Sequence, residues 1–99
     1  MEKNIVIGVK KPGEQVEFVN TTGDLKELQN IVGGYVETFP FKNGIRCWCN
    51  EEGKLHDLQP NFYFCGDCIV GTVFFSRDDD CDIASLTSDD CAYLKLIFA

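Results

Sequence analysis

The sequence has few of the residues on which most catalytic centres are built. In 99 residues it has one histidine, one methionine, one tryptophan and three prolines. The single histidine, His56, lies in a polar segment, where a surface residue is more common than a general base. No phosphate-binding loop, nucleophile elbow or paired-carboxylate signature is present. The sequence therefore favours a binding protein over an enzyme.

Long apolar runs and basic residues are also scarce. No run approaches the roughly 20 apolar residues of a membrane span, and no apolar stretch of roughly 7 to 15 residues follows a basic start, as a secretory signal requires. Lysine and arginine number 9 against 16 aspartates and glutamates, giving a net charge of -7. Such acidity is atypical of nucleic-acid binders. We therefore expect a soluble, cytoplasmic protein with no membrane and no direct nucleic-acid partner.

The apolar content, 44% of residues, is that of one compact domain covering residues 1–99. Apolar spacing predicts a first helix from Leu25 to the glycines at 33–34. The Thr87 and Asp90 pair resembles a capping box and predicts a second helix from Ser88 to Phe98, although the alternation of residues 93–98 would also suit a strand. Strand patterns occupy residues 5–9, 15–19, 35–39, 45–49 and 69–75.

The predicted order is therefore β-β-α-β-β-β-α, a single small α+β domain with a mostly antiparallel sheet of about five strands and two helices. The run at residues 69–75 lacks alternation, which is typical of a central strand covered on both faces. Residues 50–61 and the acidic segment at 77–82 are predicted to be loops.

Six cysteines raise the question of a metal site. Cys47 and Cys49 precede Cys65 and Cys68 by a spacer that would suit a four-thiolate zinc site, but only the second pair has the usual ligand spacing. Residues two apart on a strand share a face, so Ile45 and the first two cysteines would point into the core as small apolar side chains. We therefore predict buried thiols and no cofactor, with zinc as the alternative.

Two polar segments are candidate binding surfaces. One is the turn that begins at Asn50, and the other is the acidic segment whose alternate aspartates resemble the start of a calcium loop. Ile83 and Asp89 stand where an EF-hand needs glycine and glutamate, so a solvated loop is expected instead. The predicted binding residues are Asn50, Glu51, Glu52, Asn61, Asp78, Asp79 and Asp80.

Four strings between Gly33 and Phe75 occur in an order that resembles a known family. They are GGYVE from Gly33, CNEEGKL from Cys49, PN from Pro60, and GDCIVGTVF from Gly66. The sequence resembles the family named domain of unknown function 3846. The resemblance implies an origin in bacteria, phages or mobile elements, and no common activity. At Cys47, Cys65 and Cys68 the family usually has apolar or small residues, so these cysteines depart from the family pattern, which disfavours zinc.

The sequence and the resemblance lead to one main functional hypothesis and two alternatives. The main hypothesis is a non-enzymatic binding protein of phage or mobile-element origin. It would inhibit a host defence system by binding a defence protein with a basic surface or by sequestering its small signal molecule. The alternatives are a regulatory module with cysteine-bound zinc and a small enzyme that uses a cysteine with His56. Self-association remains open.

Overall fold

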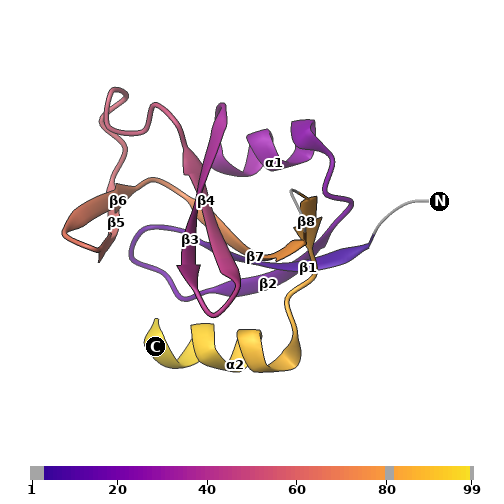
Figure 1. Ribbon diagram of the computed structural model, residues 1–99. Helices are drawn as coiled ribbons and strands as arrows, with labels where there is room; N and C mark the ends of the chain where they lie inside the picture. The colour runs from indigo at the N-terminus through magenta and orange to yellow at the C-terminus, as the bar shows by residue number, and fades with distance from the viewer. Residues whose placement is uncertain (1–3, 80–81, 99) are drawn as a thin grey trace.

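An antiparallel six-stranded sheet with one helix on each face organises the molecule (Figure 1). The computed structural model describes residues 4–79 and 82–98. Five strands follow the order β2-β1-β7-β4-β3, β8 pairs with β7, and β5 and β6 form a separate two-stranded sheet. The predicted α+β class with two helices is confirmed. The elements are β1 (Ile5–Lys10), β2 (Glu17–Thr21), α1 (Leu25–Val32), β3 (Val36–Lys42), β4 (Ile45–Asn50), β5 (Pro60–Phe64), β6 (Asp67–Val70), β7 (Val73–Asp79), β8 (Asp82–Ala84) and α2 (Ser88–Ile97).

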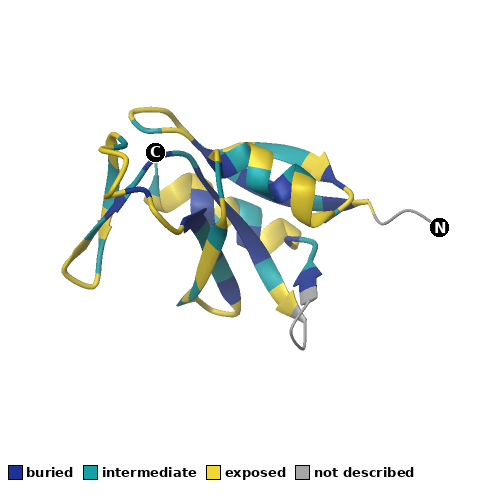
Figure 2. Ribbon diagram, turned by 90° about the horizontal axis from the view of Figure 1, so that it is seen from above, coloured by how far each residue is buried: buried dark blue, intermediate teal, exposed yellow. Residues whose placement is uncertain are grey.

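The central strand β7 divides the core into two layers. Consecutive side chains on a strand point to opposite faces, and here Phe74 and Phe75 are both fully buried, in two different clusters. Phe74 packs with Leu28 and Val32 of α1, and Phe75 lies in the cluster that contains Leu94 of α2. Buried positions run along the strands of the main sheet (Figure 2). The prediction of a strand covered on both faces is therefore confirmed for residues 73–75 of the predicted run 69–75.

Local signals in the sequence set the ends of both helices. Gly33 ends α1 in the left-handed conformation, with φ of 82°, and its N–H donates to the carbonyl of Gln29 at 2.8 Å. At α2, the Thr87 N–H donates to the Asp90 carboxylate at 2.9 Å and the Asp90 N–H donates to the Thr87 hydroxyl at 3.1 Å. This capping box confirms the predicted helix from Ser88. No helix in the described ranges is long and apolar enough to cross a membrane.

The main sheet has six strands where about five were predicted, and β5 and β6 form a second, two-stranded sheet in the described residues. The run at residues 69–75 is not one strand, because the chain turns at Gly71 with φ of 78°. The left-handed backbone conformation at this position favours glycine, and a Cβ there would also lie 2.7 Å from Leu58 Cδ1. The first half pairs with β5, which was not predicted, and only the second half enters the main sheet.

The segment at residues 77–82 was predicted to be an acidic loop, and this prediction is wrong for the part described. Strand β7 continues through Arg77 and Asp78 and pairs with β8, with Arg77 opposite Ala84. The charged side chains are accommodated by partners on neighbouring elements. The guanidinium of Arg77 pairs with Asp90 of α2, and Asp78 pairs with Arg46 of β4 at 3.6 Å. Ion pairs to β4 and to α2 therefore give the charged side chains of this polar strand partners.

Candidate functional site

The segment that follows β4 is held in place by the side chain of Asn50. Its amide nitrogen donates to the carbonyl of Val32 at 3.2 Å, and its amide oxygen accepts from the N–H of Glu52 at 2.8 Å. Asparagine favours such turns because its side chain mimics a backbone group. The N–H of Glu51 also donates to the carbonyl of Tyr35 at 2.8 Å. The turn is thereby tied to the end of α1 and the start of β3.

Two glycines of this region are required by close packing. A Cβ on Gly34 would lie 2.9 Å from the Asn50 amide nitrogen, and one on Gly53 would lie 2.8 Å from Val70 Cγ2. Real Cβ atoms are not found so close to other atoms, so a larger side chain would displace the turn. Asn50, buried between these contacts, therefore has a structural role, and the exposed residues beside it remain available for binding.

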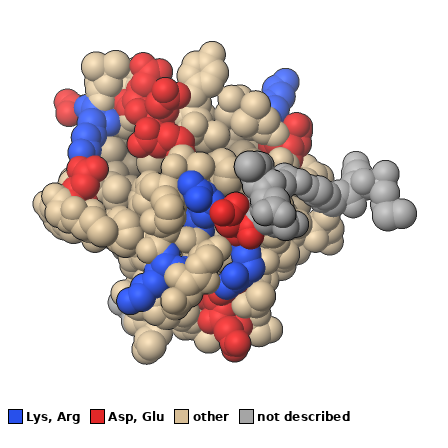
Figure 3. All heavy atoms as spheres, viewed as in Figure 1, with Lys and Arg blue, Asp and Glu red and all other residues tan. Residues whose placement is uncertain are grey.

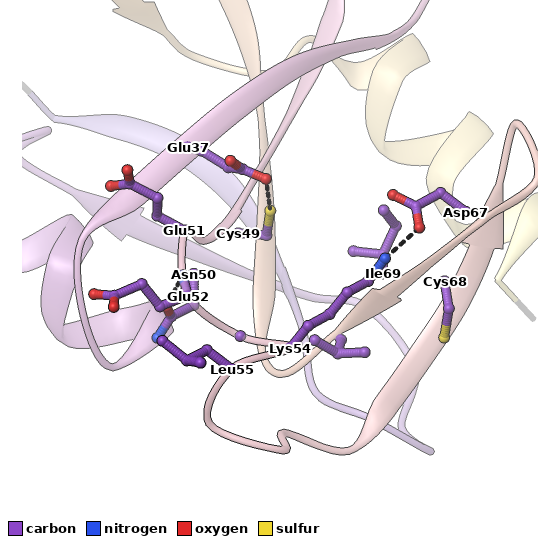
Figure 4. A pocket seen from close by; sticks show the side chains of 12 residues that line it. Glu37, Cys49, Asn50, Glu51, Glu52, Lys54, Leu55, Asp67, Cys68 and Ile69 are labelled. Atoms are coloured by element: carbon purple, nitrogen blue, oxygen red, sulfur yellow. Dashed lines mark hydrogen bonds and ion pairs between the residues drawn. The ribbon is translucent and has the colours of Figure 1, made fainter.

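A cavity of about 300 Å³ lies between this turn and the β5–β6 hairpin (Figure 4). Strand β3 contributes Glu37 and β4 contributes Cys49, while β6 supplies the opposite wall from Asp67 to Val70. The turn contributes residues 50–55. Four carboxylates line the cavity, and Lys54 is the only cation among the lining residues. The cavity is therefore acidic.

One of the four carboxylates is already paired. The ammonium of Lys54 donates to the carboxylate of Asp67, across the cavity from the turn (Figure 4). This hydrogen bond raises the pKa of Lys54 and lowers the pKa of Asp67. Both side chains are 63% exposed, so the pair contributes little to stability. Because Lys54 is engaged by Asp67, no lysine or arginine of the cavity lining is left to pair with the other carboxylates.

The other three carboxylates, on Glu37, Glu51 and Glu52, have no lysine or arginine within ion-pair distance among the described residues. Glu37 accepts a weak hydrogen bond from the Cys49 thiol at 3.7 Å. All three glutamates are exposed. Acidic side chains gather over the segment after β4 in the space-filling view (Figure 3). Carboxylates that line one cavity without counterions favour the binding of a cation.

Two large apolar side chains project beside these glutamates. Tyr35 is 66% exposed and Leu55 is 77% exposed. Leu55 lines the acidic cavity, and Tyr35 lines a second hollow that shares Asn50 and Glu52 with it. We call the surface formed by Tyr35, Glu37, Glu51, Glu52 and Leu55 the acidic loop face.

The structure brings together three of the seven predicted binding residues: Asn50, Glu51 and Glu52 line the same cavity. Asn61 lies elsewhere, with its side chain bonded to Lys10 and Gly71. Asp78 lies on the main sheet and is paired with Arg46. Asp79 is the last residue of β7. Asp80 is outside the described residues.

Sequence reasoning missed several residues of the acidic loop face and its cavity. Glu37 and Asp67 lie 30 positions apart in the chain, and their approach depends on how the unpredicted β5–β6 hairpin folds against β4. A signal was present, because both residues fall within the strings that resemble the family. Tyr35 and Leu55 fall within the same strings, but the sequence predicted only a strand for Tyr35 and a loop for Leu55.

The geometry does not support the zinc alternative. Cys47 and Cys49 lie in the buried cluster beneath α2, as the strand pattern predicted, while Cys65 is exposed at the β5–β6 turn. No group of three or more histidine, cysteine, aspartate or glutamate side chains in the described residues could hold a metal ion. Burial raises the pKa of Cys47 and Cys49, which opposes the thiolate form that zinc requires.

The burial and the pKa of the thiols should also set their rates of alkylation. Burial, followed by the nearby Glu37 carboxylate, raises the pKa of Cys49 to about 12. Among the five described cysteines, we expect Cys65 to react first with iodoacetamide at pH 8, and Cys47 and Cys49 to react more than about tenfold more slowly. Peptide mapping of a time course by mass spectrometry gives the rates. Faster reaction at Cys49 than at Cys65 would favour the cysteine-dependent enzyme instead.

The only histidine is not placed beside a thiol in the hollow that it lines. His56 is exposed and lines the second hollow together with Tyr35 and Glu52, and no cysteine contributes to that lining. A nucleophilic cysteine needs a base within hydrogen-bonding distance. The arrangement therefore gives the cysteine–histidine enzyme no geometric support.

Comparison with known proteins identifies the family. A family model described as a domain of unknown function, DUF3846, matches residues 4–99, nearly the whole chain. No curated protein and no solved structure matches significantly. The matched range contains the Asn50 turn, the acidic loop face and the β5–β6 hairpin. The chain therefore belongs to the DUF3846 family.

Proposed function

We propose that this chain is a small non-enzymatic binding protein whose acidic loop face docks onto a basic surface of a host protein. The observation that carries the proposal is the cavity of about 300 Å³ with three unpaired glutamates at its wall and rim. A lysine or arginine side chain of a partner would supply the missing positive charge. Charge complementarity of this kind speeds association and selects the partner.

Apolar anchors give the same surface a source of affinity. Exposed charges alone contribute little, because water and salt screen them. Aromatic and aliphatic side chains that become buried on docking contribute more, and tyrosine is among the residues most often important at interfaces. Tyr35 and Leu55 lie beside the glutamates and expose most of their surface. The acidic loop face thus combines the charge and the apolar area that a protein interface uses.

We further propose that the partner belongs to a host defence system, that the chain is of phage or mobile-element origin, and that it acts in the host cytoplasm as an inhibitor. This part follows from the context that the family resemblance implies. Capture of a polyanionic signal molecule is less well supported. Lys54 is engaged by Asp67 and Arg46 pairs with Asp78, while Lys10 lines a different cavity.

An infection assay tests the proposal. The chain is expressed in bacteria that carry a defence system, and phage plaques are counted with and without it. We expect the wild-type chain to restore infection and the Glu51→Gln/Glu52→Gln variant to lose most of this effect. A matched control, Glu17→Gln/Asp24→Asn, removes the same charge from exposed positions outside the acidic loop face and should remain active.

The outcomes separate the alternatives. If both double variants restore infection equally, or if no defence system tested responds, the acidic loop face is not the inhibitory surface. Mass spectrometry of small molecules released from the purified chain tests the other route. If the wild-type chain and the Glu51→Gln/Glu52→Gln variant both release one equivalent of a small anion, the protein-docking proposal is wrong. Sequestration of a signal molecule would then be the better account.

A further inference from the structure

Lys10, the last residue of β1, is a buried cation. Only 7% of its surface is exposed, which is unusual for lysine. Its ammonium donates to the Asn61 side-chain oxygen at 2.7 Å and lies 5.4 Å from the centre of the Phe98 ring. The Asn61 amide nitrogen donates to the carbonyls of Lys10 and Gly71, at 2.9 and 2.8 Å. These two bonds fix its oxygen toward the ammonium.

The charge of Lys10 is not neutralised by these contacts. No carboxylate of the described residues lies within ion-pair distance of its ammonium. An amide oxygen and a ring face attract a cation but carry no net charge. Burial of a charge without a counterion is costly, and here burial lowers the pKa of Lys10. A methionine could fill the same space without this cost, so the buried ammonium calls for another explanation.

Lys10, together with its partners Asn61 and Phe98, lines a cavity of about 420 Å³. Lys10 and Asn61 form its polar wall, and Phe62, Ile97 and Phe98 form its apolar wall. The remaining lining comes from the β1–β2 turn, residues 13–15. This cavity shares no lining residue with the acidic cavity, so what it binds is independent of the proposed docking surface.

We propose that this cavity binds a small molecule that carries a single carboxylate on an apolar body. The ammonium has three N–H donors, of which Asn61 uses one, and a carboxylate would accept the others in a charge-assisted hydrogen bond. The apolar body would lie against Phe62, Ile97 and Phe98. Glu14 also lines the cavity and would repel a polyanion, so a monocarboxylate is favoured over a phosphate or a nucleotide.

The test uses phenylacetate as the probe, with its neutral analogue phenylacetamide as the comparison, at constant ionic strength. Binding is followed by ¹H–¹⁵N NMR of the full chain. We expect saturable shifts at the Asn61 side-chain amide and at Phe62 and Phe98. The amide should bind at least about tenfold more weakly, since it lacks the charge that pairs with Lys10. Inorganic phosphate should bind more weakly than phenylacetate.

Variants assign the effect to the ammonium. Lys10→Met should abolish the difference between carboxylate and amide. Lys26→Met removes the same charge from an exposed position on α1 and should leave binding unchanged. Glu14→Gln should strengthen carboxylate binding severalfold, because it removes the repelling charge.

The proposal is overturned if wild-type protein binds the amide as tightly as the carboxylate, or phosphate more tightly than either. It is also overturned if folded Lys10→Met retains the preference. The comparison of probes on the wild-type chain decides the matter even if the Lys10 variant does not fold.

Discussion

Replacement of Phe75 by alanine is expected to lower the free energy of unfolding by about 4 kcal/mol. Phe75 is fully buried in the layer beneath α2. Its ring centre lies 5.1 Å from that of Phe41, 6.1 Å from Phe62 and 5.5 Å from Phe98. Removal of the ring leaves a cavity and breaks three aromatic contacts at once. Because domains of this size are stabilised by only roughly 5 to 15 kcal/mol, a loss of this size is a large fraction of the total.

Urea denaturation followed by the fluorescence of Trp48, the only tryptophan, measures this effect. Tyr63→Ala is the control, since Tyr63 is 79% exposed and its loss should change stability by less than about 0.5 kcal/mol. A loss below about 1 kcal/mol at Phe75 would mean that the β5–β6 hairpin and α2 do not share one aromatic core.

Replacement of Asp90 by alanine is expected to cost about 3 kcal/mol. Asp90 is 5% exposed and lies in the first turn of α2. Its carboxylate accepts from Arg77 Nε and Nη2, both at 2.8 Å, and from the Thr87 N–H. One substitution therefore leaves the Arg77 guanidinium without its counterion and removes half of the capping box.

The neighbouring Asp89 provides the matched control. It is exposed and lies in the same helical turn, but the described contacts include no hydrogen bond or ion pair of its side chain. Asp89→Ala should cost less than about 1 kcal/mol, the size of a helix-dipole effect. Equal losses for the two variants would show that helix charge, and not the pair with Arg77, stabilises this end of α2.

The same carboxylate should make stability depend on acid pH. Hydrogen bonds from Arg77, opposed by burial and supported by Thr87, lower the pKa of Asp90 from 3.8 to about 2. A group whose pKa is lower in the folded state contributes stability above its unfolded pKa and loses that contribution as the pH falls through its folded pKa. We expect about 2 kcal/mol to be lost between pH 4 and pH 2. When the free energy of unfolding is measured by urea denaturation at each pH in this range, it should change less with pH for Asp90→Ala than for wild type.

Much of the fold could be predicted because its signals are local. The capping box at Thr87, the glycine that ends α1 and the apolar segment from Val73 to Phe75 each act within a few residues. The shared face of Cys47 and Cys49 likewise follows from strand periodicity, and both thiols are buried. Patterns of this kind predict an element without knowledge of its neighbours.

The missed elements depend on distant contacts. The β5–β6 hairpin turns at Cys65 and Gly66, both with positive φ, and cysteine is not a residue that signals such a turn. Strand β7 extends through Arg77, which pairs with Ile45 of β4 and Ala84 of β8 and whose guanidinium is bonded to Asp90, 13 positions later. Only the part of the candidate site that comes from one turn could be predicted, because the rest also depends on distant contacts. Glu51 and Glu52 come from one turn, whereas Glu37 and Asp67 reach the cavity from two other strands.

The central claim is that the acidic loop face binds positively charged groups of a partner. A titration of ¹⁵N-labelled protein with a tetralysine peptide, followed by NMR, tests it most directly. We predict saturable shifts at Glu37, at residues 51–55 and at Asp67, which weaken as salt is added. Glu51→Gln/Glu52→Gln should bind about threefold or more weakly, and Glu17→Gln/Asp24→Asn should match wild type. Equal affinity of the two variants, or shifts spread evenly over the surface, would contradict the account.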